Sequence, residues 1–497
     1  MRFRLLPGIV VVLGAAGAVA VVLALVLGSA GARADATNIS RAAVGRPVPP
    51  GFVGLSIKLG SLEQYAGADP TAPDPVFVRL LSQLAPRQHP VLRLGGDGTD
   101  WSWWPVAHMA RPAGIRYTLT PQWMRVTRSL ADALGARLIL GVNMEAGSVR
   151  LASAEARAMV SGIGRGSIAA LELGNEPELY GAYGWYQLHG RPVLGRPRNY
   201  DLADFIHDFS AVVPRLPDVP LAGPASGAAS WLSGLGLFLH YEPRVRIATV
   251  HAYPLKRCRH TTVVRIAQLL SDSSSHGLAL SLESYVATAA AHGIPLRVDE
   301  MNGISCGGTP GVSDSFASAL WVLDTLFELA RTGVHGVNIG SVPGRINEVL
   351  GPDHAGGTWR MRVHPEYYGM LMFAQAAPPG SRLLRVEEPL PPGIKLWATR
   401  SPGGRIHVVV INKRLRDAQS LSLRIAGARG PATVEQLRAP RAGATRGVTL
   451  GGRSFGAETS TGELAGRLHA PTIDPSDGVY AVRVPAASAT MLTLADG

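Results

Sequence analysis

The chain of 497 residues is poor in cysteine and in lysine. It has two cysteines, Cys258 and Cys306, and only four lysines, at positions 58, 256, 395 and 413, among 48 basic residues. It contains no HExxH sequence, and its histidines are dispersed rather than clustered with cysteines at zinc-ligand spacing. Gly95-Gly96 lacks the further glycines and the lysine of a phosphate-binding loop. We therefore expect no metal site and no cofactor.

The charge of the chain is strongly one-sided. The formal net charge is +12, and arginine carries almost all of it. The basic residues are scattered and do not cluster with aromatic residues, which argues against a nucleic-acid site. The bias suits an acidic glycan as a partner, and it is equally compatible with a codon-biased genome. With 46% hydrophobic and 17% charged residues, the composition is that of a globular protein.

The N-terminus combines a basic start with a long apolar run. Arg2 and Arg4 precede an apolar stretch over 5–27, and the small-residue sequence Ala32-Arg33-Ala34 follows. This pattern predicts an export signal over residues 1–34 with cleavage after Ala34. Because the run is longer than an ordinary signal core, an uncleaved membrane anchor is the alternative. In both cases we expect the folded part to be secreted or otherwise to work outside the cytoplasm.

Short apolar strands, polar turns and helical segments alternate through residues 51–377. Eight strands are predicted, over 52–57, 91–94, 138–142, 170–173, 219–222, 247–250, 296–299 and 336–339. Helices are expected between them, including 74–84, 121–134 and 313–330, the last with Ser313 as its N-cap. A strand followed by a helix, repeated eight times, predicts an α/β fold, a closed (β/α)8 or TIM barrel with long loops.

The sequence pattern changes after Pro378-Pro379-Gly380. Beyond this point, six short segments alternate or run apolar between Gly, Pro and Ser turns, over 394–398, 406–411, 421–425, 433–437, 480–484 and 490–494. They predict an all-β domain of sandwich size over residues 378–497. A short extended stretch, residues 35–50, precedes the barrel.

The turn after the fourth predicted strand contains the first candidate catalytic residue. The sequence LELGNEPELY, residues 171–180, ends an apolar strand and puts Asn175 and Glu176 at a proline-stopped turn. Side chains just past the C-terminal end of a barrel strand face an open cleft, which is where barrel enzymes place their catalytic groups. On this turn alone, a solvated glutamate at a strand-to-helix junction is the alternative.

A second glutamate closes the seventh predicted strand. The segment LRVDEMNGISCGG, residues 296–308, puts Glu300 at the strand end, so that in a barrel it points into the same cleft as Glu176. A retaining glycosidase needs two carboxyl groups about 5 to 5.5 Å apart, one to protonate the leaving oxygen and one to attack the anomeric carbon. We predict that Glu176 is the proton donor and that Glu300 is the ionised nucleophile.

These motifs resemble glycoside hydrolase family 79, the heparanase and β-glucuronidase family. The resemblance is carried by Asn175-Glu176-Pro177, by Glu300 with Cys306-Gly-Gly and the segment GVSDSFASALW (311–321), and by RLGGDGTDW (93–101). It extends from about Phe52 to the C-terminus. It implies a barrel followed by a β-sandwich, to which the segment before the barrel, here residues 38–48, lends a strand.

The resemblance also implies roles for individual residues. By it, Glu176 is the acid/base, Glu300 is the nucleophile, and Asn175 holds the 2-hydroxyl of the sugar. Asp100 would grip another hydroxyl in the cleavage subsite, and a turn residue is the alternative for it. The family has an aromatic residue shortly after the nucleophile that helps to hold the uronic acid carboxylate, whereas this chain has residues 301–306, MNGISC, there.

Two further residues are candidates for the site. Arg345, in the loop after the eighth strand, is a candidate to replace the missing carboxylate contact, because a guanidinium binds a carboxylate through two parallel hydrogen bonds. The alternative is an ordinary surface arginine. Tyr253, in His251-Ala-Tyr253 after the sixth strand, is expected to donate a hydrogen bond to Glu300, and a tyrosine packed under a loop is the alternative. His251 is as easily a structural histidine.

The two cysteines fall in the loops after the sixth and seventh predicted strands. Adjacent loops at one barrel mouth make a disulfide between Cys258 and Cys306 geometrically reasonable, and an exported chain favours it. Two separate buried thiols are the alternative. The bridge would clamp the segment that carries Glu300.

Together, these residues predict an exported retaining glycoside hydrolase that cleaves a β-linked uronic acid from a glycan or glycoside. A carbohydrate is therefore the expected partner. A related barrel glycosidase for a neutral sugar, such as a xylosidase or arabinofuranosidase, is the first alternative. The second alternative is a glycan-binding surface protein without catalysis.

Overall fold

The computed structural model describes residues 36–258, 262–354, 357–387, 389–428 and 430–495. The predicted export signal or membrane anchor over residues 1–34 lies outside these ranges. Within them, no helix combines the length and the apolar character that a membrane span requires.

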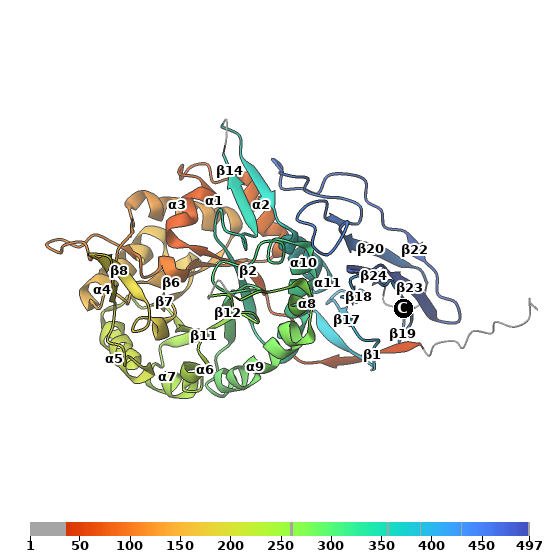
Figure 1. The fold of residues 1–497 in the computed structure, drawn as a ribbon, viewed down its shortest axis with the longest axis horizontal. Coiled ribbons are helices and arrows are strands. Elements are labelled where there is room, and N and C mark those ends of the chain that lie inside the picture. The colour runs from red at the N-terminus through yellow and green to blue at the C-terminus, as the bar shows by residue number, and fades with distance from the viewer. Residues whose placement is uncertain (1–35, 259–261, 355–356, 388, 429, 496–497) are drawn as a thin grey trace, which may run out of the picture. The chain divides into compact units, whose positions relative to one another are not determined.

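Eight parallel strands close into a barrel, which fills one part of the molecule (Figure 1). Each predicted strand overlaps one of them, so the predicted TIM barrel is confirmed. Their side chains are almost all buried, because helices cover the outside and side chains fill the inside. In their order around the barrel, the strands are β2 (Val53–Lys58), β3 (Val91–Gly95), β6 (Arg137–Val142), β7 (Ile168–Leu173), β10 (Leu221–Ser226), β11 (Val245–Ala252), β12 (Leu296–Met301) and β13 (Gly336–Ser341), and β13 pairs with β2.

The helices follow the apolar periodicity of the sequence. In α3 (Pro121–Leu134), the side chain of Thr120 accepts a hydrogen bond from the first turn, and Gly135 ends the helix in the left-handed conformation. The others are α1 (Leu62–Ala66), α2 (Pro75–Leu84), α4 (Val149–Ile163), α5 (Leu202–Val212), α6 (Ala229–Leu232), α7 (Leu235–Tyr241), α8 (Ile266–Leu269), α9 (Asp272–Ala291), α10 (Phe316–Thr332) and α11 (Pro365–Ala376).

Helix α10 begins later than predicted, and the expected N-cap was wrong. Its N-cap is Ser315, whereas the hydroxyl of Ser313 accepts a hydrogen bond from the backbone N–H of Thr309 at 3.0 Å. Ser313 therefore closes a turn before the helix. Every residue of α10 from Phe316 to Ala330 is buried, because α9 and α11 pack against it.

The C-terminal domain is built on a ten-stranded sheet. Strand β1 (Thr37–Val44), from the segment before the barrel, lies inside this sheet, antiparallel to β16 and parallel to β19. β16, β21 and β22 have no counterpart among the predicted strands. The strands after the barrel are β16 (Arg382–Val386), β17 (Ile394–Arg400), β18 (Ile406–Asn412), β19 (Gln419–Ile425), β20 (Ala432–Arg438), β21 (Thr449–Leu450), β22 (Thr472–Ile473), β23 (Val479–Val484) and β24 (Ser488–Leu494).

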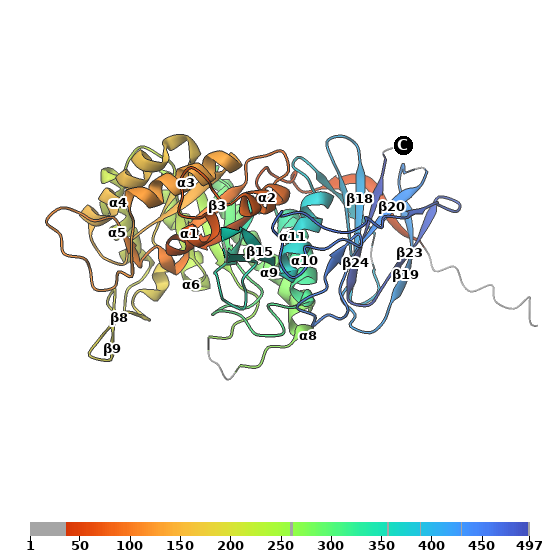
Figure 2. The same ribbon diagram turned by 90° about the horizontal axis from the view of Figure 1, so that it is seen from above.

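Strand β18 is buried on both faces. Val408 and Val410 pack in the core of the sandwich, together with side chains from β19 and β23. Val409 and Ile411 belong instead to the large core that includes α10 and α11, and Figure 2 shows these helices next to β18. Burial on both faces explains the unbroken apolar run over residues 408–411 in this strand.

Three two-stranded pairs extend the loops between the larger elements. They are β4 (Ser102–Trp103) with β5 (Tyr117–Thr118), β8 (Gly184–Leu188) with β9 (Arg191–Leu194), and β14 (Leu350–Asp353) with β15 (Arg360–Val363). The β8–β9 hairpin follows β7 and projects away from the helices in Figure 2.

Candidate active site

A cleft of about 960 Å³ lies at the C-terminal ends of the barrel strands. Glu176 and Glu300 both line it, with 22% and 20% of their side chains exposed. The cleft therefore gives access to both carboxyl groups. The other candidate substrate-binding residues also line it, namely Asp100, Asn175, Tyr253 and Arg345.

Glu176 lies on a sharp turn that begins with a glycine. Gly174 has a φ of +81°, and a side chain there would come within 2.5 Å of the Tyr180 hydroxyl. Glu176 itself has a φ of +45°, in the left-handed region, which costs about 1 to 3 kcal/mol for a residue other than glycine. Its backbone N–H donates to the carbonyl of Ala225 at 2.9 Å. The surrounding strands thus hold the turn that presents the carboxyl group to the cleft.

Glu300 is held as a carboxylate by three neighbours. The guanidinium of Arg93 donates to its Oε2 at 2.7 Å, and the hydroxyl of Tyr253 donates to its Oε1 at 2.5 Å. Burial favours the neutral acid, but the charges of His251 and Arg93 and these hydrogen bonds outweigh it and lower the pKa of Glu300 to about 2. Glu300 is therefore ionised at neutral pH, as a nucleophile requires.

Arg93 is the fully buried centre of this network. Besides Glu300, its Nε lies 2.6 Å from Glu172 Oε2 and 3.0 Å from Asp299 Oδ2, and its Nη2 donates to Asn175 Oδ1 at 2.9 Å. One planar guanidinium therefore links the strand that carries the nucleophile to the turn that carries Asn175.

Two of the acids around Arg93, Glu172 and Asp299, carry one negative charge between them. Burial and the neighbouring Glu172 raise the pKa of Asp299 well above its ordinary value. Burial also acts on Glu172, but the charge of Arg93 and a hydrogen bond from Asp299 lower the pKa of Glu172 overall. Asp299 therefore keeps its proton and Glu172 is the anion of this pair. Besides Glu300, Arg93 therefore faces one negative charge from this pair and not two.

His251 contacts Glu176 and acts on Glu300 through its charge. Its Nδ1 lies 3.0 Å from Glu176 Oε1, and its ring is fully enclosed. Burial favours the neutral ring, but the charge of Glu300, the neighbouring Asp299 carboxyl group and the hydrogen bond to Glu176 raise the pKa of His251 to about 10. The imidazole is therefore a cation that acts on both glutamates.

Asp100 lines the cleft, and groups of the protein hydrogen-bond to both of its carboxylate oxygens. Its Oδ1 accepts hydrogen bonds from the backbone N–H groups of Met144 and Glu145, at 2.9 and 3.1 Å. Its Oδ2 accepts from the backbone N–H of Asn175 at 3.0 Å and from the Tyr180 hydroxyl at 2.8 Å. Because each carboxylate oxygen already accepts two hydrogen bonds, the geometry favours a residue that fixes two loops over one that grips a sugar hydroxyl.

Sequence reasoning did not assign roles to Arg93, Glu172 and Asp299. The signal was present, because each is a charged residue inside a short apolar strand. A charge at such a position is expensive unless it is paired. Three such residues on different strands of one barrel indicate an ion-pair network inside it.

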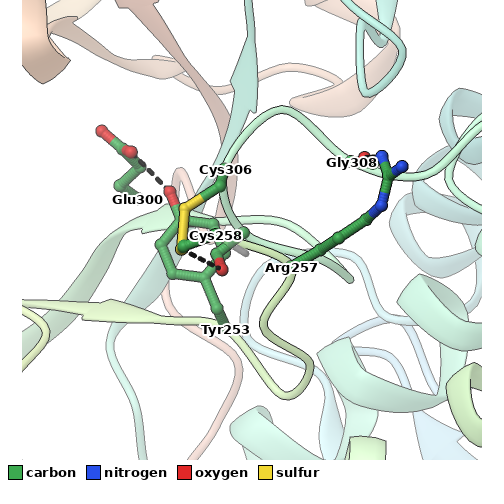
Figure 3. The surroundings of a disulfide bond; sticks show 7 residues. Tyr253, Arg257, Cys258, Glu300, Cys306 and Gly308 are labelled. Atoms are coloured by element: carbon green, nitrogen blue, oxygen red, sulfur yellow. Dashed lines mark hydrogen bonds between the residues drawn. A yellow bond between two sulfur atoms is a disulfide. The ribbon is translucent and has the colours of Figure 1, made fainter. Parts of the chain in front are cut away.

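The loops after β11 and β12 are joined next to Glu300. Cys258 and Cys306 form a disulfide, and Figure 3 shows this bond close to Tyr253 and its hydrogen bond to Glu300. Arg257 Nη1 also donates to the carbonyl of Gly308 at 3.1 Å, across the same two loops. Both cysteines line the cleft. The bridge therefore fixes the wall of the cleft beside the carboxylate that is to react.

Arg345 lies in the cleft wall with an exposed side chain. Within the described ranges, no hydrogen bond or ion pair reaches its guanidinium. It is therefore available to an anionic group of a ligand. The same part of the chain contains no group of three His, Cys, Asp or Glu side chains placed to hold a metal ion.

The C-terminal domain has a recognisable family. Residues 396–491 match the family described as "Glycosyl hydrolase family 79 C-terminal beta domain". The match covers the region from β17 to β24 and does not include the barrel. A search of curated protein sequences finds no match.

Solved structures with the same fold cover almost the whole chain. The 4-O-α-L-rhamnosyl-β-D-glucuronidase of Fusarium oxysporum 12S has 19% identity and a TM-score of 0.73, over 92% of this chain and 100% of that chain. The GH51 arabinofuranosidase of Xanthomonas axonopodis pv. citri has 14% identity and a TM-score of 0.62, over 92% and 99%. The α-L-arabinofuranosidase of Thermotoga maritima has 13% identity and a TM-score of 0.63, also over 92% and 99%.

At these identities the structural neighbours establish the fold alone. The family match assigns the C-terminal domain to the family 79 C-terminal β-domains, and it confirms the predicted resemblance to glycoside hydrolase family 79. The cleft adds two accessible carboxyl groups at the ends of β7 and β12. Together they identify the chain as a glycoside hydrolase, a TIM barrel that carries a family 79 C-terminal β-domain.

Proposed function

We propose that the enzyme is a retaining glycosidase that removes a β-linked uronic acid from a glycan or glycoside. One observation carries the mechanism: Glu300 is held ionised by Arg93, His251 and Tyr253 in the cleft that Glu176 also lines. Glu300 attacks the anomeric carbon while Glu176 gives its proton to the leaving oxygen, which produces a glycosyl ester. Glu176 then takes a proton from water, and this water releases the sugar from Glu300.

The neighbours of the two glutamates support these roles. The Tyr253 hydroxyl and Arg93 each hold one oxygen of Glu300, which fixes the orientation of the attacking carboxylate. The Oδ1 of Asn175 accepts from Arg93, and in the described part of the chain no hydrogen bond uses its NH₂ group. That amide is free to donate to the 2-hydroxyl of the sugar, where such a contact strengthens in the transition state.

The preference for a uronic acid rests on cationic groups in the cleft. Arg345, Lys58 and Lys256 line it, and Arg345 has an exposed guanidinium. Lys58 is paired with Asp97 at 2.7 Å, so Arg345 is the better partner for a carboxylate. The family 79 domain and the neighbouring rhamnosyl-glucuronidase support the same substrate class.

Stereochemistry tests the mechanism directly. Proton NMR of the first product formed from 4-nitrophenyl β-D-glucuronide should show the β-anomer before it equilibrates. An α-anomer as first product would contradict the retaining mechanism. A panel of chromogenic glucuronides, xylosides and arabinofuranosides, assayed in parallel, tests the sugar.

Arg345 provides the test of carboxylate recognition. We expect Arg345→Ala to lower kcat/KM on the glucuronide about tenfold or more, because a charged hydrogen-bonding group is lost. The matched substrate is the corresponding β-glucoside, which lacks the carboxylate and should be affected far less. Unchanged kinetics on the glucuronide would remove Arg345 from the site.

A neutral sugar is the second candidate substrate. The observation that favours it is the structural likeness to two arabinofuranosidases over 92% of the chain. The residues at 301–306 favour it as well, because they supply no aromatic side chain for a uronic acid. Faster cleavage of an arabinofuranoside or xyloside than of the glucuronide in the panel would establish this alternative.

We further infer that the enzyme works outside the cytoplasm. The basic and apolar N-terminal sequence supports export, and the bond between Cys258 and Cys306 suits an oxidising compartment. Fractionation of the producing cells, with an antibody against the barrel, tests this location. Recovery of the chain in the cytoplasmic fraction alone would contradict it.

A further inference from the structure

Glu145 is a buried acid in the cleft that the proposed mechanism does not use. It follows β6 and lines the same cavity as Glu176 and Glu300. Only 9% of the residue is exposed. Among the described residues, none forms a hydrogen bond with its carboxyl group. Because Glu145 lines the cleft, a ligand bound there can supply the hydrogen-bond partner that the protein does not.

The main chain around Glu145 fixes the position of its side chain. Its backbone N–H donates to Asp100 Oδ1 at 3.1 Å, and its carbonyl accepts from Arg196 Nη1 at 2.8 Å. Gly195 packs against the side chain so closely that a Cβ there would lie 2.3 Å from Cγ of Glu145. Because Asp100 also binds the backbone of Asn175, the main chain of Glu145 is fixed relative to the turn that carries Glu176.

The surroundings of Glu145 suit a sugar ring. Trp101, Tyr183 and Trp185 line the same cleft, and Tyr183 is 62% exposed. The indole N–H of Trp185 donates to the carbonyl of Asp100 at 2.9 Å, which holds this ring next to the Glu145 loop. Arg116 lies 3.7 Å from the ring centre of Trp101. The exposed ring of Tyr183, in the same cleft as a hydrogen-bonding carboxyl group, matches the apolar faces and the hydroxyls of a sugar.

The protonation of Glu145 adds to this match. Burial and the neighbouring Asp100 raise the pKa of Glu145 to about 9, although Arg196 and Arg116 oppose the shift. The group is therefore a neutral acid at pH 7. A neutral carboxyl group can both donate and accept a hydrogen bond, which is what a pair of sugar hydroxyls requires.

The position of Glu145 separates it from the bond that is cleaved. In the barrel order, β6 lies four strands from β12 in a closed ring of eight, on the side opposite Glu300. A sugar whose anomeric carbon contacts Glu300 therefore has its next unit toward Glu145. We propose that Glu145 binds hydroxyl groups of the sugar unit adjacent to the one at the cleavage subsite, so that the enzyme selects an oligosaccharide. The proposal rests on the proposed function.

Substrate length tests this subsite. We compare kcat/KM for 4-nitrophenyl β-D-glucuronide with kcat/KM for a tetrasaccharide of β-linked glucuronic acid alternating with N-acetylglucosamine. Glu145→Leu should lower the ratio of tetrasaccharide to nitrophenyl glycoside at least about tenfold, because the hydrogen bonds to the adjacent sugar are lost. Glu145→Gln retains a donor and an acceptor and should stay within about threefold of the original ratio.

The control is Glu283→Gln, an exposed glutamate on α9, which should leave the ratio unchanged. An unchanged ratio in Glu145→Leu, or an equal fall in the Gln and Leu variants, would overturn the proposal. If the unmodified enzyme cleaves neither substrate, the proposed function fails by itself. Calorimetry of tetrasaccharide binding to the unmodified chain and to Glu145→Leu then decides the subsite: weaker binding by about tenfold supports it, and equal binding overturns it.

Discussion

Two buried charge clusters in this molecule are built from similar groups, but one lies at the candidate active site and the other between α10 and the C-terminal sheet. The Arg93 cluster consists of Arg93, Glu172, His251, Asp299 and Glu300. The Asp324 cluster lies between α10 and the C-terminal sheet, where Asp324 accepts hydrogen bonds from Lys413 at 2.6 Å, Ser275 at 2.6 Å and Trp397 at 2.8 Å. The Asp324 side chain is fully enclosed, whereas a fifth of the Glu300 side chain faces the cleft.

This difference separates a structural cluster from a reactive one. Both oxygens of Asp324 are used by groups of the protein, so the cluster ties the barrel to the C-terminal domain, with which it forms one unit from Thr37 onward. In the Arg93 cluster the positive charges keep Glu300 ionised, yet its carboxylate still reaches the cleft. The four lysines divide in the same way, because Lys58 and Lys256 line the cleft while Lys395 and Lys413 lie at the domain interface.

Removing the carboxylate of Glu300 should have the largest effect on activity. Glu300→Gln keeps the shape of the side chain but cannot form the glycosyl ester, so kcat on an activated glycoside should fall by about 10³-fold or more. The measurement is the steady-state rate with a nitrophenyl glycoside. Circular dichroism, recorded in parallel, confirms that the variant is folded. A rate within tenfold of the unmodified enzyme would mean that another group is the nucleophile.

The corresponding change in the Asp324 cluster should lower the stability of the protein and leave its catalytic activity intact. Asp324→Asn leaves the buried ammonium of Lys413 with only the exposed Asp272, 3.9 Å away, as a counter-ion, which should cost about 3 kcal/mol of unfolding free energy. Urea unfolding measures this loss, and the activity per folded molecule should stay within about twofold. A loss below about 1 kcal/mol, or a fall in the activity of folded protein, would contradict the division into two kinds of cluster.

The sequence predicted those features that depend on local pattern. The eight strands were found because apolar runs and polar turns repeat, and Glu176 and Glu300 were found because both stand where such a run ends. The N-cap of α10 was misplaced, since Ser313 satisfies a turn that local pattern does not reveal. The hydrogen bonds of Asp100 were also missed, because its four donors come from two separate loops, one after β6 and one after β7. Contacts of that kind exist only after the strands have closed into a barrel.

The link between Glu300 and His251 has a pH dependence with a definite sign. Folding lowers the pKa of Glu300 from 4.5 to about 2, so its contribution to stability is complete above 4.5 and is lost as the pH falls through about 2. Folding raises the pKa of His251 from 6.5 to about 10, so its contribution is complete below 6.5 and is lost as the pH rises through about 10. The pair therefore stabilises the site fully only between these two ordinary values.

Removing the charge of His251 should shift the acid side of the activity profile. In His251→Asn, the pKa of Glu300 should rise from about 2 toward 4.5, because the largest opposing charge is gone. We measure kcat/KM from about pH 3 to 7. Toward pH 3 it should stay level for the unmodified enzyme and fall for the variant. His276→Asn, whose ring pairs with Glu328 on α10, is the matched control and should keep the original profile. Identical acid limbs in His251→Asn and the control would show that Arg93 and Tyr253 alone keep Glu300 ionised.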